Sequence, residues 1–167
     1  MKSLLLSVTA LAAVACGGSD PAPTPIPLAP AIVVRITDPT EGAVVGLTTI
    51  QVTGTYAPAD LTDDVWLFVF PALAPGRGWH QSGNAPAGLP AERLHAQQHW
   101  TVPASLGGPP QSYDLAVFTA PANSATTAAL RQYLTDWSRT GDFIGLTQSQ
   151  IDALSGLVER HRVRIRR

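Results

Sequence analysis

The residues best suited to bind a ligand lie in a glycine-rich segment near the middle of the chain. Positions 76–84 read Gly-Arg-Gly-Trp-His-Gln-Ser-Gly-Asn, within a proline- and glycine-rich stretch from Pro71 to Pro90 that predicts a loop. An indole ring stacks on sugars, whereas guanidinium, imidazole and amide groups hydrogen-bond hydroxyls. The alternative is that Trp79 packs back on the domain and closes the loop. The segment predicts a ligand site formed by Arg77, Trp79, His80, Gln81 and Asn84.

Two other patterns match catalytic or metal-binding motifs only in part. His95 and His99 have the spacing of zinc-binding histidines, but no glutamate follows His95. Asp63 and Asp64 are adjacent, and adjacent strand residues point to opposite faces. The serine elbow, phosphate loop and dinucleotide fingerprint are absent from the sequence. We therefore expect solvent-facing histidines, carboxylates that solubilise a strand entrance, and no enzyme activity, metal or cofactor. An envelope hydrolase or metal protein is the less favoured alternative.

The N-terminus has the features of an export signal that ends at Cys16, the only cysteine. A positive start precedes an apolar run at 4–15 that is too short to span a bilayer. Ala13-Val14-Ala15-Cys16 resembles the lipobox of bacterial lipoproteins. The resemblance implies cleavage before Cys16 and lipid attachment to it. Gly17 in the next position resembles the signal for sorting to the outer membrane, if the cell has one. Ordinary secretion with a free thiol is the alternative.

Prolines alternating with small residues follow the cysteine, as expected for an extended spacer. The remaining 137 or so residues are enough for one domain, and the lone cysteine excludes a disulfide framework. A net charge of −1 argues against a nucleic-acid partner, because such proteins carry a basic surface. The predicted organisation is a signal peptide at 1–15, a tether at 16–30 and a domain at 31–167.

Short apolar or alternating segments separated by turn residues predict a mainly β domain of sandwich type. The segment 65–70 is apolar on both faces, which is typical of a strand buried on both sides. The predicted strands cover residues 31–37, 50–56, 65–70, 99–102, 112–119 and 161–166.

In their order along the chain, these segments resemble a bacterial immunoglobulin-like surface module. The resemblance rests on Ile36-Thr37-Asp38-Pro39, Ile50–Thr55, Val65–Val69, a strand centred on Trp100, and Tyr113–Val117. It implies an immunoglobulin-like (Ig-like) β-sandwich and a non-enzymatic role as a spacer, adhesive or accessory module.

A helical insertion at about 123–158 precedes the last predicted strand. Asn123 or Ser124 is placed to cap a first helix, and Thr147 with Gln150 matches a capping box that opens a second. One face of the first helix carries Leu130, Tyr133, Leu134 and Trp137 at helical spacing.

The alternation within 65–70 places Val65, Leu67 and Val69 inside the sandwich and Trp66, Phe68 and Phe70 outside. We expect the first inserted helix to cover these outward aromatic rings, with an exposed sugar-stacking platform as the alternative. In the last strand we expect Val163 and Ile165 to point inward and Arg162, Arg164 and Arg166 outward. Anion binding by the arginines is the alternative.

The sequence therefore predicts a lipid-anchored cell-envelope protein that acts as a binding or scaffolding module. Its expected partners are the membrane, through the lipidated N-terminus, and a polysaccharide or an envelope protein. The alternative within the same class is a carbohydrate-binding module that uses the 76–84 segment.

Overall fold

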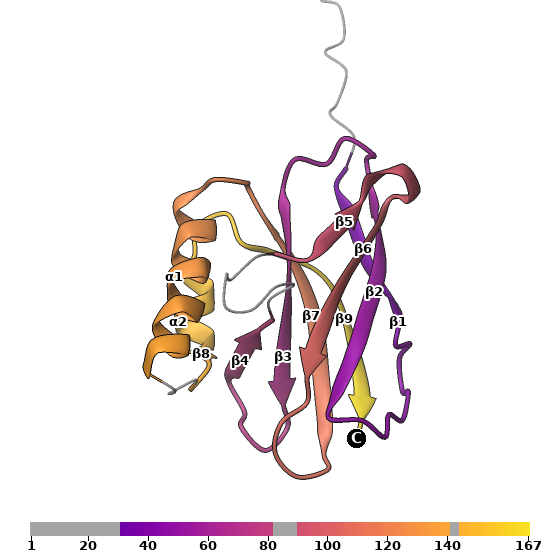
Figure 1. Cartoon of the computed structure of the whole chain (residues 1–167), viewed down its shortest axis with the longest axis vertical. Coiled ribbons are helices and arrows are strands. Elements are labelled where there is room, and N and C mark those ends of the chain that lie inside the picture. Colours follow the sequence, from indigo (N-terminus) through magenta and orange to yellow (C-terminus); the bar gives the residue numbers. More distant parts are fainter. Residues whose placement is uncertain (1–30, 82–89, 141–143) are drawn as a thin grey trace, which may run out of the picture.

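The computed structural model of the chain describes residues 31–81, 90–140 and 144–167. The predicted signal peptide, Cys16 and the tether lie outside the described residues. The described part contains two antiparallel sheets and two helices (Figure 1). Sheet A has the order β1 (Val33–Asp38), β2 (Thr49–Ala57), β6 (His99–Ser105), β5 (Glu92–Leu94). Sheet B has the order β8 (Leu146–Thr147), β4 (Arg77–His80), β3 (Asp64–Pro71), β7 (Ser112–Ala120), β9 (Val158–Arg166).

This strand order confirms the predicted Ig-like β-sandwich. Strands β1, β2, β6 and β5 face strands β4, β3, β7 and β9, as the ABED and CFG sheets of immunoglobulin domains face each other. Tyr113 lies near the start of β7, and its hydroxyl donates to the backbone oxygen of Gly107 at 2.7 Å. This is the arrangement known as the tyrosine corner, which ties the β6–β7 connection to the following strand.

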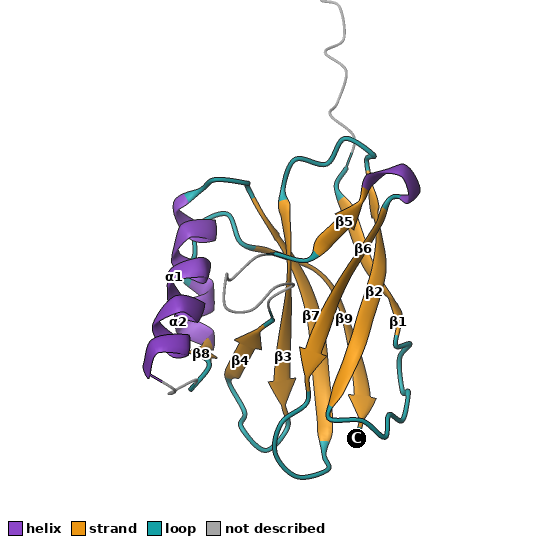
Figure 2. Cartoon of the chain, viewed as in Figure 1, coloured by secondary structure: helices purple, strands orange, loops and turns teal. Residues whose placement is uncertain are grey.

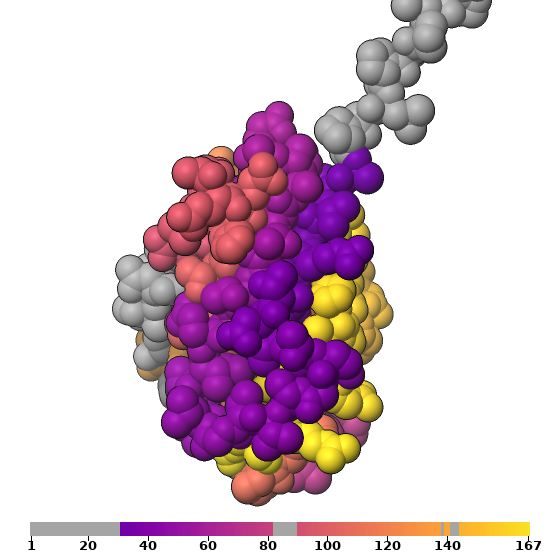
Figure 3. Space-filling model, turned by 90° about the vertical axis from the view of Figure 1, so that its right-hand side faces the viewer, coloured from indigo at the N-terminus to yellow at the C-terminus, as the bar shows by residue number. Residues whose placement is uncertain are grey.

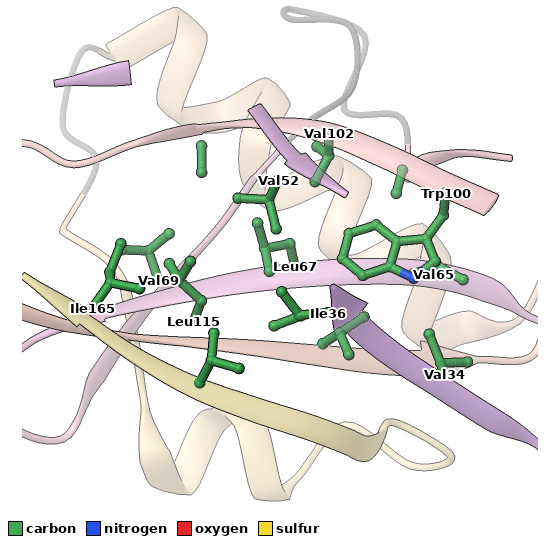
Figure 4. Close-up of a cluster of buried hydrophobic side chains, with 14 of the residues drawn as sticks. Val34, Ile36, Val52, Val65, Leu67, Val69, Trp100, Val102, Leu115 and Ile165 are labelled. Atoms are coloured by element: carbon green, nitrogen blue, oxygen red, sulfur yellow. The ribbon is translucent and has the colours of Figure 1, made fainter. Parts of the chain in front are cut away.

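The core lies between the sheets and is formed by alternate residues of each strand (Figure 4). Val65, Leu67 and Val69 of β3 point into it and are almost fully buried, as the alternation predicts. Sheet A contributes Trp100, whose ring lies against Gly54 of β2: a Cβ at position 54 would overlap the indole and the Arg35 carbonyl oxygen. The small residue at position 54 is therefore required by the close approach of this ring.

Both helices cover the outer face of sheet B (Figure 2). Helix α1 (Ala125–Thr140) begins after Ser124, whose hydroxyl accepts a hydrogen bond from the Thr127 N–H at 3.1 Å. Helix α2 (Gln148–Asp152) begins at Thr147 with the predicted capping box. The insertion before the last strand and its position over the outward aromatic residues are confirmed. A second cluster of buried hydrophobic residues lies between sheet B and the helices. It contains Trp66, Phe68, Ala116, Phe118, Ala120, Leu130, Leu146 and Ile151.

Strand β9 joins the two sheets along one edge of the sandwich. Its His161 Nδ1 accepts from the Ile36 N–H of β1 at 3.3 Å, and its Arg164 carbonyl accepts from the Gly42 N–H at 2.7 Å. Figure 3 shows β9, in yellow, directly beside the N-terminal segment in indigo. Val163 and Ile165 are buried in the core, as predicted.

The arginines of β9 are held by acidic and aromatic partners on the outer face of sheet B. The Arg164 Nε donates to Asp114 at 2.6 Å, and the Arg162 guanidinium lies 4.7 Å from the centre of the Phe70 ring. The Arg164 and Arg162 guanidinium groups hold the pKa of the Asp114 carboxyl below its usual range. These arginines therefore form a strand face, as expected.

Candidate functional site

The predicted ligand loop contains a strand. Arg77–His80 form β4, which pairs with β3 through Phe68↔His80 and Val69↔Trp79. The opposite edge of β4 pairs with β8, through Arg77↔Thr147 and Gly78↔Leu146. The expectation of a loop from Pro71 to Pro90 is therefore wrong over these four residues. Pairing with two neighbours overrides the low strand propensity of a glycine-rich sequence.

Arg77 is directed into the helical insertion. Its Nη1 donates to the Ile144 carbonyl at 3.0 Å and lies 3.5 Å from the Gly145 carbonyl. Through these contacts the guanidinium holds Ile144 and Gly145, the two residues that precede β8.

Trp79 is half-buried and lies against the same part of the insertion. A Cβ at Gly145 would lie 2.7 Å from its indole ring, and Gly145 has a φ of +74°. A side chain at position 145 is therefore excluded by both the ring and the backbone conformation. On this side Trp79 packs on the domain, as the alternative to a ligand-binding role predicted.

His80 points in the other direction, into the aromatic cluster under α1. It is 1% exposed, and its ring centre lies 5.9 Å from that of Trp66 and 5.5 Å from that of Tyr133. Burial lowers the pKa of His80 to about 3 because the apolar surroundings disfavour the imidazolium. A neutral imidazole of such low basicity is a poor general base near neutral pH.

Gln81 bridges the two sheets on the side of the sandwich opposite β9. Its Nε2 donates to the Trp79 carbonyl at 2.8 Å, and its Oε1 accepts from the Ser105 N–H of β6 at 2.9 Å. Both ends of the amide are therefore engaged within the fold. Asn84, the last residue of the predicted site, lies outside the described residues.

A cleft of about 590 Å³ opens beside Gln81, between the ends of β3, β4 and β6 and helix α1. We call it the cleft throughout. Its volume lies within the range of about 300–1,000 Å³ that is usual for small-molecule sites. Trp79, His80 and Gln81 of the predicted site line it, whereas Arg77 does not. The other described lining residues are Thr49, Val69, Pro71, Leu73, Ala74, Pro103, Ser105, Gly107, Gly108, Gln111, Tyr113, Leu134 and Trp137.

The residues that sequence reasoning missed come from segments far apart in the chain. Leu134 and Trp137 were assigned to the helix face over the aromatic residues, and Tyr113 to a strand face. Leu134 is 5% exposed, so it packs against the body of the domain as well as lining the cleft. Only the tertiary arrangement brings these side chains to Trp79, and no spacing within the sequence signals it.

The histidine pair is not arranged as a metal site. His95 lies in a short 3₁₀ helix (His95–Gln97), and its Nδ1 lies 3.1 Å from the Tyr56 hydroxyl. His99 begins β6, and both histidines are exposed, as expected. Within residues 31–81, 90–140 and 144–167, no three histidine, cysteine, aspartate or glutamate side chains gather as a metal-binding group.

Asp64 differs from the expectation of a solvated carboxylate. It is 7% exposed, and its Oδ2 lies 3.8 Å from Nη2 of Arg131 on α1. Burial raises the pKa of Asp64 despite the opposing effect of the Arg131 and Arg93 charges. The expectation was wrong because it ignored the helix that covers this strand end.

Comparison of the sequence with protein-family models found no matching family, and comparison with curated proteins found no related one. Among the described residues, no helix is long and apolar enough to span a membrane.

Proposed function

We propose that the chain is an exported, lipid-anchored protein of the cell envelope that binds a partner molecule in the cleft without chemical conversion. The anchor is the lipid on Cys16, in the outer membrane if the cell has one. The strand order of the domain supports the resemblance to bacterial immunoglobulin-like surface modules. The observation that carries the binding role is the position of the cleft relative to the point where the tether enters the domain.

The tether enters at one end of the sandwich and the cleft lies at the other. Val33, at the start of β1, pairs with Ala57 at one end of β2. Thr49, at the opposite end of β2, pairs with Ser105, and both line the cleft. The eight residue steps between Thr49 and Ala57 span about 26 Å at the usual strand rise. In Figure 1 the described chain begins at the upper end, while the β3–β4 and β6–β7 connections lie at the lower end. An anchor on Cys16 thus leaves the cleft directed away from the membrane.

The chemistry of the cleft favours binding over catalysis. Its histidine is neutral and weakly basic, and the Gln81 amide is engaged by the backbone on both sides. These groups fix the shape of the cleft wall rather than supply a proton or a nucleophile.

The anchor is tested by labelling cells with a radioactive or clickable palmitate during expression of the full chain. We expect label on the wild-type chain and none on Cys16→Ser, with the variant released from the membrane fraction. Label on Cys16→Ser, or none on the wild type, would contradict the proposed anchor.

The binding role is tested by capture of cell-envelope fragments on the immobilised chain. We expect Trp79→Ala to lose the captured material, whereas Leu94→Ala, an exposed substitution on β5, retains it. Equal capture by both variants would remove the cleft from the proposed function.

A polysaccharide is the second candidate ligand, and one observation supports it: the half-buried Trp79 ring borders the cleft. A soluble oligosaccharide that competes with capture would identify this class.

A further inference from the structure

We infer that the cleft takes an uncharged hydrocarbon group, such as the alkyl chain of a lipid or a related amphiphile. This rests on the proposed binding role of the cleft and adds the chemical class of its ligand. Apolar side chains from several elements face the cleft, so a ligand there meets hydrocarbon on several sides. They are Val69, Pro71, Leu73, Ala74, Trp79, Pro103, Tyr113, Leu134 and Trp137.

The described wall of the cleft carries no side chain that is charged at neutral pH. None of its lining residues is an aspartate, glutamate, lysine or arginine, and burial keeps the pKa of His80 at about 3. The guanidinium of Arg77, on the same strand as Trp79, does not line the cleft and is held by the Ile144 carbonyl. A charged ligand group would lose its hydration here and gain no opposite charge, so the electrostatics select an uncharged group.

Three polar side chains around the cleft, those of Gln81, Gln111 and Tyr113, are engaged by the protein itself. Gln81 bonds Trp79 and Ser105. The Gln111 Oε1 accepts from the Leu73 N–H at 2.7 Å, and the Tyr113 hydroxyl donates to Gly107. A sugar needs hydrogen-bonding groups to replace the water around its hydroxyls, and these groups are committed elsewhere. The arrangement therefore disfavours a polyhydroxylated ligand.

The strand edge at the cleft is also closed to an added peptide strand. The Leu106 N–H donates to Thr48 on the β2 side, and the Ser105 N–H donates to Gln81 on the other side. By strand alternation, Pro103 occupies this second side and has no N–H to offer. Strand addition by an extended peptide needs a row of unpaired backbone groups. An apolar side chain or alkyl group needs none, which leaves the hydrocarbon class as the best fit.

The test uses the exported chain carrying Cys16→Ser, so that no attached lipid competes for the cleft. The fluorescent probe N-phenyl-1-naphthylamine, which is uncharged and apolar, is titrated into the protein and then displaced by 1-decanol, decanoate or cellohexaose. We expect 1-decanol to displace the probe at least as effectively as decanoate, and cellohexaose to leave it bound.

A matched pair of variants assigns the binding to the cleft. Leu73 and Leu47 are each 67% exposed, but only Leu73 lines the cleft. We expect Leu73→Glu to weaken probe binding about tenfold, since it removes an apolar contact with the probe and adds a charge, and Leu47→Glu to leave it unchanged.

Four results would overturn the inference. They are a lack of probe binding, displacement by cellohexaose alone, a strong preference for decanoate, and equal effects of the two leucine variants. Envelope capture that is lost in Trp79→Ala, together with no binding of probe or decanol, would contradict the ligand class and leave the proposed function standing.

Discussion

At the residue scale, Gln81 connects the two sheets on the side of the sandwich opposite β9. Substitution by alanine leaves the Ser105 N–H and the Trp79 carbonyl without their side-chain partner. We expect Gln81→Ala to lower the free energy of unfolding by about 1–2 kcal/mol, the usual cost of two such hydrogen bonds. Urea denaturation measures this. Gln132→Ala, on the exposed face of α1, is the control and should change stability by less than about 0.5 kcal/mol. A loss at Gln81 no larger than at Gln132 would contradict the bridging role.

His80 makes the stability of the domain dependent on pH. Its pKa is about 3 in the folded state and 6.5 in the unfolded chain, so the unfolded chain binds a proton first as pH falls. The folded state therefore loses stability between about pH 6.5 and pH 3, by up to about 1.4 kcal/mol per pH unit. We expect His80→Gln to remove this slope from denaturation curves measured between about pH 4 and pH 7.

The exposed His99 provides the control for this measurement. His99→Gln should keep the wild-type slope, because it leaves the buried imidazole of His80 in place. A wild-type slope that persists in His80→Gln would show that another group carries the proton linkage.

The residue types of the site could be predicted from the sequence, but the direction in which each side chain points could not. Of the five predicted site residues, Arg77, Trp79, His80 and Gln81 are described and Asn84 is not, and three of the four described residues line the cleft. Some of these side chains point to the cleft, one to the helical insertion and one to the buried aromatic cluster. Where each one points depends on β4, a strand whose two faces are covered by different elements. A sequence pattern of four residues carries no information about those neighbours.

At the element scale, helix α1 protects the aromatic face of sheet B. Leu130 is fully buried among these rings, so its truncation leaves a cavity. We expect Leu130→Ala to lower the free energy of unfolding by about 2–5 kcal/mol. Leu73→Ala, at an exposed position, should cost well under about 1 kcal/mol. Thermal unfolding of both variants checks this, and equal midpoints would contradict the packing of α1 on the sheet.

The contact between Asp64 and Arg131 joins the same helix to β3. Burial raises the pKa of Asp64, so the folded state holds its proton more tightly than the unfolded chain does. The ionised carboxylate thus destabilises the fold above that pKa, and the effect disappears as pH falls below the unfolded value. We expect Asp64→Asn to raise the free energy of unfolding at pH 7 and to have little effect near pH 3. Destabilisation at pH 7 would mean that attraction to Arg131 outweighs the cost of burial.

The elements that sequence reasoning found are those with strong periodic or capping signals. Alternating or continuously apolar patterns predicted β1, β2, β3, β7 and β9 within two or three residues at most ends, and the capping box placed the start of α2. The missed strands β4, β5 and β8 have four, three and two residues. Such short strands form because a longer neighbour offers unpaired backbone groups, so their own sequence contains little of the signal.

At the scale of the whole molecule, the domain has an attachment end and a cleft end about 26 Å apart along β2. Strand β9 and the 42–45 segment close one side of the sandwich, and the cleft lies beside Gln81 on the other. The proposed tether adds up to about 30 Å if residues 21–30 adopt polyproline geometry. These lengths predict that the attachment end lies, on average, closer to the membrane than the cleft end does.

The order of distances is measurable because Cys16 is the only native cysteine and its thiol is consumed by the proposed lipid. Asp60→Cys and Leu73→Cys each introduce one exposed thiol, at the attachment end and the cleft end. With the lipidated chain in vesicles that contain an acceptor lipid, we expect stronger energy transfer from a dye at position 60 than from one at position 73. Deletion of residues 21–30 should increase transfer from both positions and keep their order. Stronger transfer from position 73 would mean that the cleft faces the bilayer, and a ligand would then be drawn from the membrane itself.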